Sequence, residues 1–192
     1  MSEANDLKDA GVFKEWWANP SIIGLMGFAL TTMVTGLHNA GYFDATPTLA
    51  LAITFGGTAQ FVAGIVDLRK GSIFGGSAFI SYGAFWWSVF VFAFVLPKLG
   101  FTPGAVEHAV FFGIWALFTF SFCIAVLKVG KYLSVLFWLL LLAFILLALL
   151  SLGLAPKVLV GWEIFITGLC AWYIATAELV NTVHGKKVLP LA

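Results

Sequence analysis

Polar side chains inside long apolar segments are the residues of this sequence best suited to chemistry. The amides and hydroxyls among them can donate hydrogen bonds to a carboxylate, and no Lys or Arg lies within these segments. A polar group at membrane depth needs a partner or a water-filled cavity. Neutral donors let a bound anion move on, whereas a deep cation would slow its release. We therefore predict a solute-binding set made of Asn39, Thr54, Thr58, Gln60, Ser81 and Thr119.

Two titratable residues near the ends of apolar segments could be linked to protons. His38 can change charge near neutral pH, although it could equally be an interfacial histidine with satisfied hydrogen bonds. Glu178 is a candidate proton carrier or a helix-end carboxylate bonded to its neighbours. Negative charge near an anion path opposes the anion, so a deep Glu178 must be neutral, paired or off the path. Asp67 stands beside Arg69 and Lys70, which favours a solvated ion pair.

The elements that must position these side chains are six apolar runs, each close to the roughly 20 residues that span a hydrocarbon core as a helix. Barrel strands would be about half as long and would alternate polar with apolar residues, which these runs do not. All six prolines lie at run ends or in connections, so nothing indicates interrupted helices. We predict an all-α membrane bundle with transmembrane helices at about 21–43, 49–66, 73–96, 105–127, 132–155 and 158–179.

The composition excludes several classes of protein. Hydrophobic residues make up 61% of the 192 residues and charged residues only 10%, against about 25% charged residues in soluble domains. A net charge of +1 offers no basic field for nucleic acid. The short connections contain no nucleophile with a base, no metal cluster and no phosphate-binding loop. We therefore expect neither an enzyme nor a bound cofactor or metal.

Basic residues predict how the bundle is oriented. With six spans, eight Lys and Arg residues share one side and two lie on the other, which places the eight in the cytoplasm. The chain then divides into a cytoplasmic segment 1–18, a transmembrane domain 19–182 and a cytoplasmic tail 183–192. We expect a multi-pass protein of the inner (cytoplasmic) membrane. The eight are Lys8, Lys14, Arg69, Lys70, Lys128, Lys131, Lys186 and Lys187, and the two are Lys98 and Lys157.

Asn19 and Pro20 open the first apolar run. Asn is a favoured N-cap, and Pro at the first helical position has no amide hydrogen to leave unsatisfied. The positive end of this helix would face the cytoplasmic mouth, where it can attract an anion. A purely structural cap explains the same two residues, so both interpretations stay open here.

Five segments taken together resemble one family. They are NPSIIGLMGF (Asn19 to Phe28), LHNAGYF (Leu37 to Phe43), GGTAQFVAGIVDLRKGSIFG (Gly56 to Gly75), AFISYGAFW (Ala78 to Trp86) and AWYIATAELVN (Ala171 to Asn181). In this order, on a six-span chain, they resemble the acetate uptake transporter family, which includes the succinate–acetate permeases. The resemblance runs from Asn19 to about Pro190. Members of the family often read Asn-Pro-Ala-Pro-Leu-Gly-Leu where this chain has Ser21, Ile22 and Ile23.

The resemblance implies a homo-hexamer in which each subunit surrounds its own pore for acetate, with succinate as a possible second substrate. The pore of the family narrows at a hydrophobic triad of Phe, Tyr and Leu. Phe28 and Tyr82 match the first two, and Leu140 is the third by counting on from Lys128 and Lys131. Ordinary packing is the alternative role for each of the three side chains.

Two other functions remain open at this level. A channel for a small neutral solute, such as urea or a short amide, would also have six spans, hydrogen-bonding side chains and aromatic constrictions. A membrane partner of another complex would need only the apolar runs, and it would leave the polar residues within them unexplained. Transport of a carboxylate can be passive or coupled to protons, and the residues do not separate these two mechanisms.

Overall fold

The computed structural model describes residues 17–191, and within them six helices are long and apolar enough to cross a membrane. The predicted all-α fold with six spans is thereby confirmed. Nearly all of the predicted cytoplasmic segment 1–18 lies outside the described residues. The helices are α2 (Ser21–Ala40), α3 (Thr46–Ile53), η1 (Thr54–Ala59), α4 (Gln60–Arg69), α5 (Ile73–Phe90), η2 (Val91–Val95), α6 (Leu96–Lys98), α7 (Ala105–Val126), α8 (Lys131–Ser151) and α9 (Lys157–His184).

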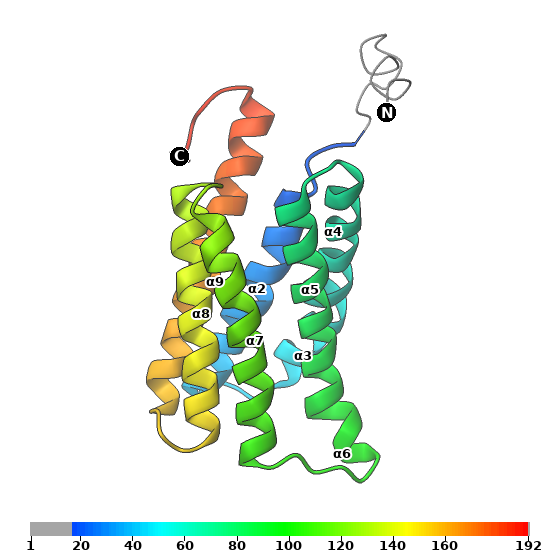
Figure 1. Ribbon diagram of the computed structural model, residues 1–192, viewed down its shortest axis with the longest axis vertical. Helices are drawn as coiled ribbons and strands as arrows, with labels where there is room; N and C mark the ends of the chain where they lie inside the picture. Colours follow the sequence, from blue (N-terminus) through cyan, green and yellow to red (C-terminus); the bar gives the residue numbers. More distant parts are fainter. Residues whose placement is uncertain (1–16, 192) are drawn as a thin grey trace.

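The six spans stand side by side as one bundle (Figure 1). Helix α2 packs against α9 and against the span formed by α3, η1 and α4, while α4 packs on α5, and α8 packs on both α7 and α9. The described chain begins and ends at the same end of the bundle, at the top of Figure 1. We call this the N/C end, and the other the opposite end.

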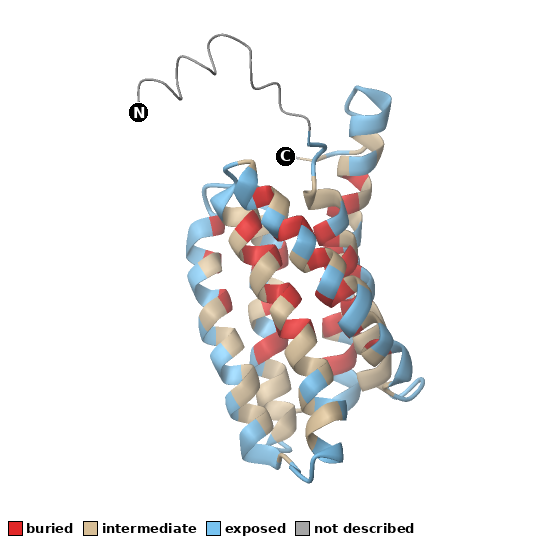
Figure 2. Ribbon diagram, turned by 90° about the vertical axis from the view of Figure 1, so that its right-hand side faces the viewer, coloured by how far each residue is buried: buried red, intermediate tan, exposed pale blue. Residues whose placement is uncertain are grey.

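Burial follows the two sides of each helix, with buried residues turned inward and exposed residues outward (Figure 2). Helix α7 illustrates the outward side, where Val110, Ile114, Leu117 and Ile124 are all more than half exposed. Such a row of bare aliphatic side chains suits lipid or a neighbouring subunit, because neither offers a hydrogen-bonding partner. The spans therefore direct their polar side chains mainly toward the inside of the bundle or toward their own backbone.

Glycines bring α2 and α9 into backbone contact. A Cβ atom at Gly36 would lie 2.5 Å from the backbone nitrogen of Phe165, and one at Gly168 would lie 2.7 Å from the backbone nitrogen of Met33. Small residues at such crossings allow helices in membranes to approach closely. This contact holds the first and last spans together and so places their inward faces side by side.

The second span is less regular than the sequence indicates. Its residues Thr54–Ala59 form a π-helical segment, although the span contains no proline after its first turn. Gly56 lies in this segment and allows α2 to approach closely, because a Cβ atom there would lie 2.5 Å from the Thr31 hydroxyl oxygen. Wide turns of this kind occur often at functional sites, and here the turn ends directly before Gln60.

Candidate functional site

Two cavities enter the bundle from opposite ends. The N/C cavity has a volume of about 560 Å³ and the opposite cavity about 320 Å³. Ser21, Ser72 and Glu178 mark the first as opening at the N/C end, whereas His38 and Ser151 mark the second as opening at the opposite end. Both cavities are bordered by Phe28 and Leu140. These two side chains therefore stand where the cavities meet.

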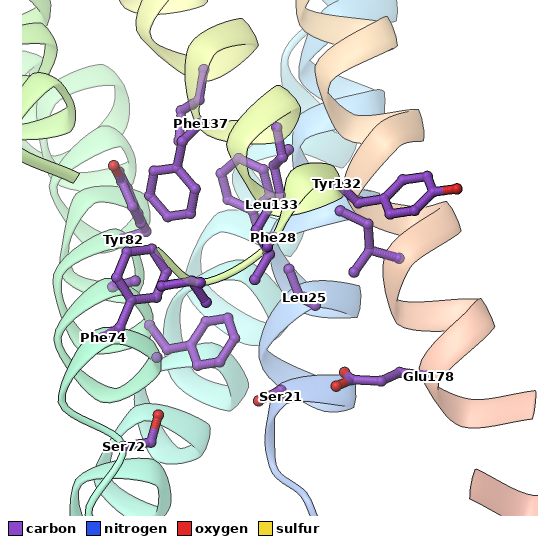
Figure 3. A pocket seen from close by; sticks show the side chains of 18 of the residues that line it. Ser21, Leu25, Phe28, Ser72, Phe74, Tyr82, Tyr132, Leu133, Phe137 and Glu178 are labelled. Atoms are coloured by element: carbon purple, nitrogen blue, oxygen red, sulfur yellow. The ribbon is translucent and has the colours of Figure 1, made fainter. Parts of the chain in front are cut away.

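The three residues of the predicted constriction lie close to this level. Phe28, Tyr82 and Leu140 are each less than 7% exposed, and all three border the N/C cavity. The ring centroids of Phe28 and Tyr82 are 6.0 Å apart. Figure 3 shows the side chains of this cavity, with Phe28 from α2 and Tyr82 from α5. Apolar side chains at a narrow level make a solute shed its water there.

Gln60 supplies a buried amide at the wall of the N/C cavity. Its side chain is 1% exposed, and its Oε1 atom has no hydrogen-bond partner within the described chain. It is the first residue of α4, directly after the π-helical segment. Buried polar atoms in proteins nearly always find a partner. The Oε1 atom can accept from a water molecule in the cavity, and the Nε2 hydrogens, which no oxygen of residues 17–191 accepts, can donate to a solute.

The mouth of the N/C cavity joins the first and last spans. Asn19 accepts a hydrogen bond from the backbone amide of Ser21 through Oδ1 (3.0 Å) and donates one from Nδ2 to Glu178 Oε1 (3.2 Å). The other carboxyl oxygen of Glu178 is buried without a partner in the described chain. Asn19 thus binds the first residue of α2 from just outside the helix. Pro20 stands at the N-cap position, so both predicted positions are shifted by one residue.

The opposite cavity contains two further predicted residues, Asn39 and His38. The Asn39 amide nitrogen donates to Thr35 O (3.0 Å), and His38 Nδ1 lies 2.9 Å from Phe43 O. Sequence reasoning missed Thr32 and Thr35 on the same wall of this cavity. The spacing could have indicated them, because residues 28, 32, 35 and 39 follow one another on a single face of a helix.

Four of the predicted binding residues do not reach a cavity. The hydroxyls of Thr54 and Thr58 donate to their own backbone, at Ala50 O (2.8 Å) and Ile53 O (2.7 Å), and both residues are exposed on the outside of the bundle. A helical hydroxyl can always be satisfied in this way, so its presence in a span does not require a cavity. The two remaining residues, Ser81 and Thr119, also border neither cavity.

The expected solvated ion pair of Asp67 is wrong. This carboxylate is only 4% exposed, and its Oδ2 atom has no hydrogen-bond partner in the described chain. Lys70 instead donates to the backbone oxygens of Trp17 (3.2 Å) and Ala18 (3.4 Å). Lys70 therefore turns toward the segment before α2, and Asp67 is left inside the bundle.

Six helices of membrane-spanning length surround two cavities, and apolar side chains separate the cavities where they meet. This arrangement defines a multi-pass membrane protein with a candidate transport pore. The chain belongs to the GPR1/FUN34/yaaH family, whose model matches residues 8–190. This membership confirms the resemblance found in the sequence motifs.

Several similar proteins are named as transporters or channels. The chain is 40% identical to the succinate-acetate/proton symporter SatP of Escherichia coli (strain K12), over 91% of this chain and 95% of the relative. It is 33% identical to acetate permease A of Emericella nidulans, over 92% of this chain and 66% of the relative. The solved structure of the bacterial acetate channel SatP matches with a TM-score of 0.87 and 40% identity, covering 92% of this chain and 99% of that one. These relatives agree with the expectation that the chain is not an enzyme.

Proposed function

We propose that this protein transports acetate, and also succinate, through a pore within each subunit. The observation that carries this proposal is the pair of cavities that approach from opposite ends and share Phe28 and Leu140 as their boundary. The names of the relatives supply the class of solute. A carboxylic acid with a pKa of about 4 is almost wholly ionised at neutral pH, so its anion needs a path across hydrocarbon.

The side chains around the cavities suit a mobile anion. The Gln60 amide can donate to a carboxylate in the N/C cavity, and Asn39 offers an amide in the opposite cavity. Among residues 17–191, no Lys or Arg lines either cavity, so the anion meets hydrogen-bond donors there without being held by a full opposite charge. Between these donors, Phe28, Tyr82 and Leu140 form the level at which the anion must lose water.

Glu178 and His38 are the proposed proton-linked groups, one at each end of the path. Both border a cavity, and one carboxyl oxygen of Glu178 has no partner in the described chain. An ionised Glu178 repels an approaching carboxylate, whereas a neutral one does not. A proton taken up at the N/C mouth would therefore favour entry of the anion.

Flux measurements on the purified protein in liposomes test the proposal. We expect uptake of labelled acetate well above that of protein-free liposomes, a response to membrane potential, and a further increase when a pH gradient is imposed. Labelled urea serves as the neutral solute and should not pass. Uptake of urea together with no uptake of acetate would replace the proposal by a channel for neutral solutes.

The assembly and its location complete the proposal. We propose a homo-hexamer in the inner (cytoplasmic) membrane, with the N/C end in the cytoplasm and with 19–182 as the transmembrane domain. The hexamer is supported by the family resemblance, and the bare apolar outer faces of the helices offer surface for subunit contacts. The mass of the detergent-solubilised protein tests it, because six chains of 20.8 kDa differ clearly from one.

A further inference from the structure

The hydroxyl groups of Tyr82 and Thr119 form a hydrogen bond whose direction can be assigned. Their oxygens are 2.9 Å apart, and Thr119 Oγ1 also lies 2.7 Å from the backbone oxygen of Trp115. A threonine hydroxyl has a single hydrogen, and a carbonyl oxygen can only accept. Thr119 therefore donates to Trp115 O and accepts from Tyr82, so the phenolic hydrogen of Tyr82 points at Thr119.

This bond turns the polar end of Tyr82 away from the solute path. Tyr82 borders the N/C cavity, but Thr119 is completely buried and borders neither cavity. In Figure 3 the Tyr82 oxygen points away from Phe28 and Leu25, which lie on the other side of the cavity. The cavity wall at this level is therefore formed by the carbon atoms of the ring.

The hydrogen bond to Thr119 also fixes the Tyr82 ring at a place where α5 and α7 are not in close backbone contact. Helices α5 and α7 approach each other at few backbone positions, and aromatic side chains fill the space between them. Tyr82 packs there with ring centroids 5.7 Å from Phe118 and 6.2 Å from Trp115. Within residues 17–191, the Tyr82–Thr119 bond is the one hydrogen bond that joins α5 to α7.

We propose that Thr119 is a positioning residue of the constriction, which acts on the solute only through Tyr82. By accepting the phenolic hydrogen, Thr119 holds the ring beside Phe28 and keeps a hydrogen-bond donor out of the narrowest part of the path. This inference rests on the proposed transport function. It assigns to Thr119 a role different from the solute binding expected from the sequence.

Loss of the bond should change selectivity rather than only stability. A ring that is no longer tied to Thr119 can move away from Phe28. In Thr119→Val the unpaired Tyr82 hydroxyl also favours this movement, because it can then reach water or solute in the cavity. The level beside Phe28 then widens and admits bulkier acids. One neutral hydrogen bond corresponds to about a three- to tenfold change in an equilibrium, and we expect the succinate-to-acetate flux ratio to rise by a similar factor.

A double-mutant cycle in proteoliposomes tests the proposal through the succinate-to-acetate flux ratio. Thr119→Val keeps the shape of the side chain but cannot accept the bond, and Tyr82→Phe removes the donor. Each variant should raise the ratio, and the double variant should show no further rise. Thr119→Ser keeps the hydroxyl and should restore the wild-type ratio. Ser88→Ala on α5 is the matched control, because the Ser88 hydroxyl bonds only to Ala84 O and Phe85 O.

Three outcomes would overturn this role of Thr119. The first is an unchanged succinate-to-acetate flux ratio in folded Thr119→Val. The second is a flux ratio in Thr119→Ser equal to that of Thr119→Val, and the third is that the effects of Thr119→Val and Tyr82→Phe add up in the double variant. If Thr119→Val cannot be purified, Tyr82→Phe alone must still raise the ratio, and an unchanged ratio contradicts the proposal. Absence of acetate flux in the wild-type protein would instead reject the transport function itself, so the two failures are distinguishable.

Discussion

At the scale of single residues, Gln60 and Asn39 offer amides to the two cavities, while apolar side chains separate them. Both residues are uncharged, so each can donate one hydrogen bond to an anion without binding it as tightly as a cationic side chain would. Gln60 is the better placed of the two. No oxygen among residues 17–191 accepts a hydrogen bond from its amide nitrogen, so both amide hydrogens can donate to an anion, whereas the Asn39 amide nitrogen already donates to Thr35 O.

Gln60→Leu should weaken competition by acetate in a solute-binding or uptake assay. A hydrogen bond to a charged group contributes about 1.5–3 kcal/mol, so we expect a loss of at least about tenfold in affinity. Thr54→Val is the matched control, since its hydroxyl bonds to the Ala50 carbonyl on the outside of the bundle. Unchanged competition in folded Gln60→Leu would assign Gln60 to packing, and a loss in Thr54→Val would restore the original expectation for that residue.

Truncation of the constriction should accelerate flux and relax the size limit. Phe28→Ala and Leu140→Ala each widen and wet the level at which the cavities meet. A barrier lower by about 1.4 kcal/mol raises the rate about tenfold, and succinate should gain more than acetate. Both variants require a check of folding, because Phe→Ala in a core costs about 3–5 kcal/mol. Wild-type rates and size limits in both folded variants would mean that the pore narrows elsewhere.

Glu178→Gln should alter how uptake depends on pH. The substitution removes the charge but keeps a side-chain oxygen that can accept from Asn19, so the mouth should keep its shape. Repulsion between an ionised Glu178 and the entering anion is lost. We therefore expect faster uptake at the pH values at which wild-type Glu178 is ionised, and equal uptake at low pH. Identical pH profiles for the two proteins would remove Glu178 from the transport path.

At the scale of the elements, the segment after α9 folds back over the N/C cavity. Asn181 Oδ1 accepts from the backbone amides of Val188 (2.7 Å) and Leu189 (2.8 Å), and its Nδ2 donates to Leu189 O (2.8 Å). The Tyr173 hydroxyl donates to Pro190 O (2.9 Å). These bonds bring Leu191 to the wall of the cavity. The last span therefore supplies both the mouth residue Glu178 and a cover beside it.

Asn181→Ala should release this segment. Each lost bond contributes about 1 kcal/mol, so the released state should become at least about tenfold more populated. Limited trypsin digestion measures this, because Lys186 and Lys187 precede the tied residues and cleavage follows the released population. Asn181→Asp is the control, since it keeps the acceptor for both backbone amides. Equal cleavage of wild type and Asn181→Ala would show that other contacts hold the segment.

At the scale of the whole molecule, charge differs between the two ends. The turns between α4 and α5 and between α7 and α8 lie at the N/C end. Lys70 and Lys128 lie in these turns, Arg69 is the last residue of α4 and Lys131 is the first residue of α8. Lys98 and Lys157 lie in or beside the connections at the opposite end. Of the eight residues counted for the predicted cytoplasmic side, Lys8 and Lys14 lie outside the described residues. The remaining asymmetry still favours a cytoplasmic N/C end.

Labelling of single introduced cysteines tests this orientation. Lys98→Cys should react with an impermeant thiol reagent in intact cells, and Lys186→Cys should react only after the membrane is opened. The two native cysteines lie within spans, and Cys123 is fully buried, so their background labelling should be low. Reaction of both positions from the same side would contradict the six-span topology, and the reverse pattern would invert the orientation.

Hydrophobicity along the chain is sufficient to predict the six spans, because a helix that crosses lipid must be apolar over about 20 residues whatever its neighbours are. The family motifs are likewise visible as residue patterns, and it is the resemblance to the family, through these motifs, that predicts a role for Phe28 and Tyr82 in a constriction. The interior of each span is less predictable. The π-helical turn before Gln60 includes Gly56, which packs closely on Thr31 of another helix, and nothing in the local sequence indicates this turn.

Only the tertiary structure decided which polar residues face the path. Thr54 and Gln60 are equally suitable donors as far as the sequence shows. In the structure Gln60 borders the N/C cavity, whereas the Thr54 hydroxyl bonds to the backbone of its own helix on the outside of the bundle, as a helical hydroxyl always can. The Asn19–Glu178 hydrogen bond joins residues 159 positions apart, and the Tyr82–Thr119 hydrogen bond joins α5 to α7. Such pairs arise from how the helices pack around each other, and this packing cannot be predicted from the local sequence.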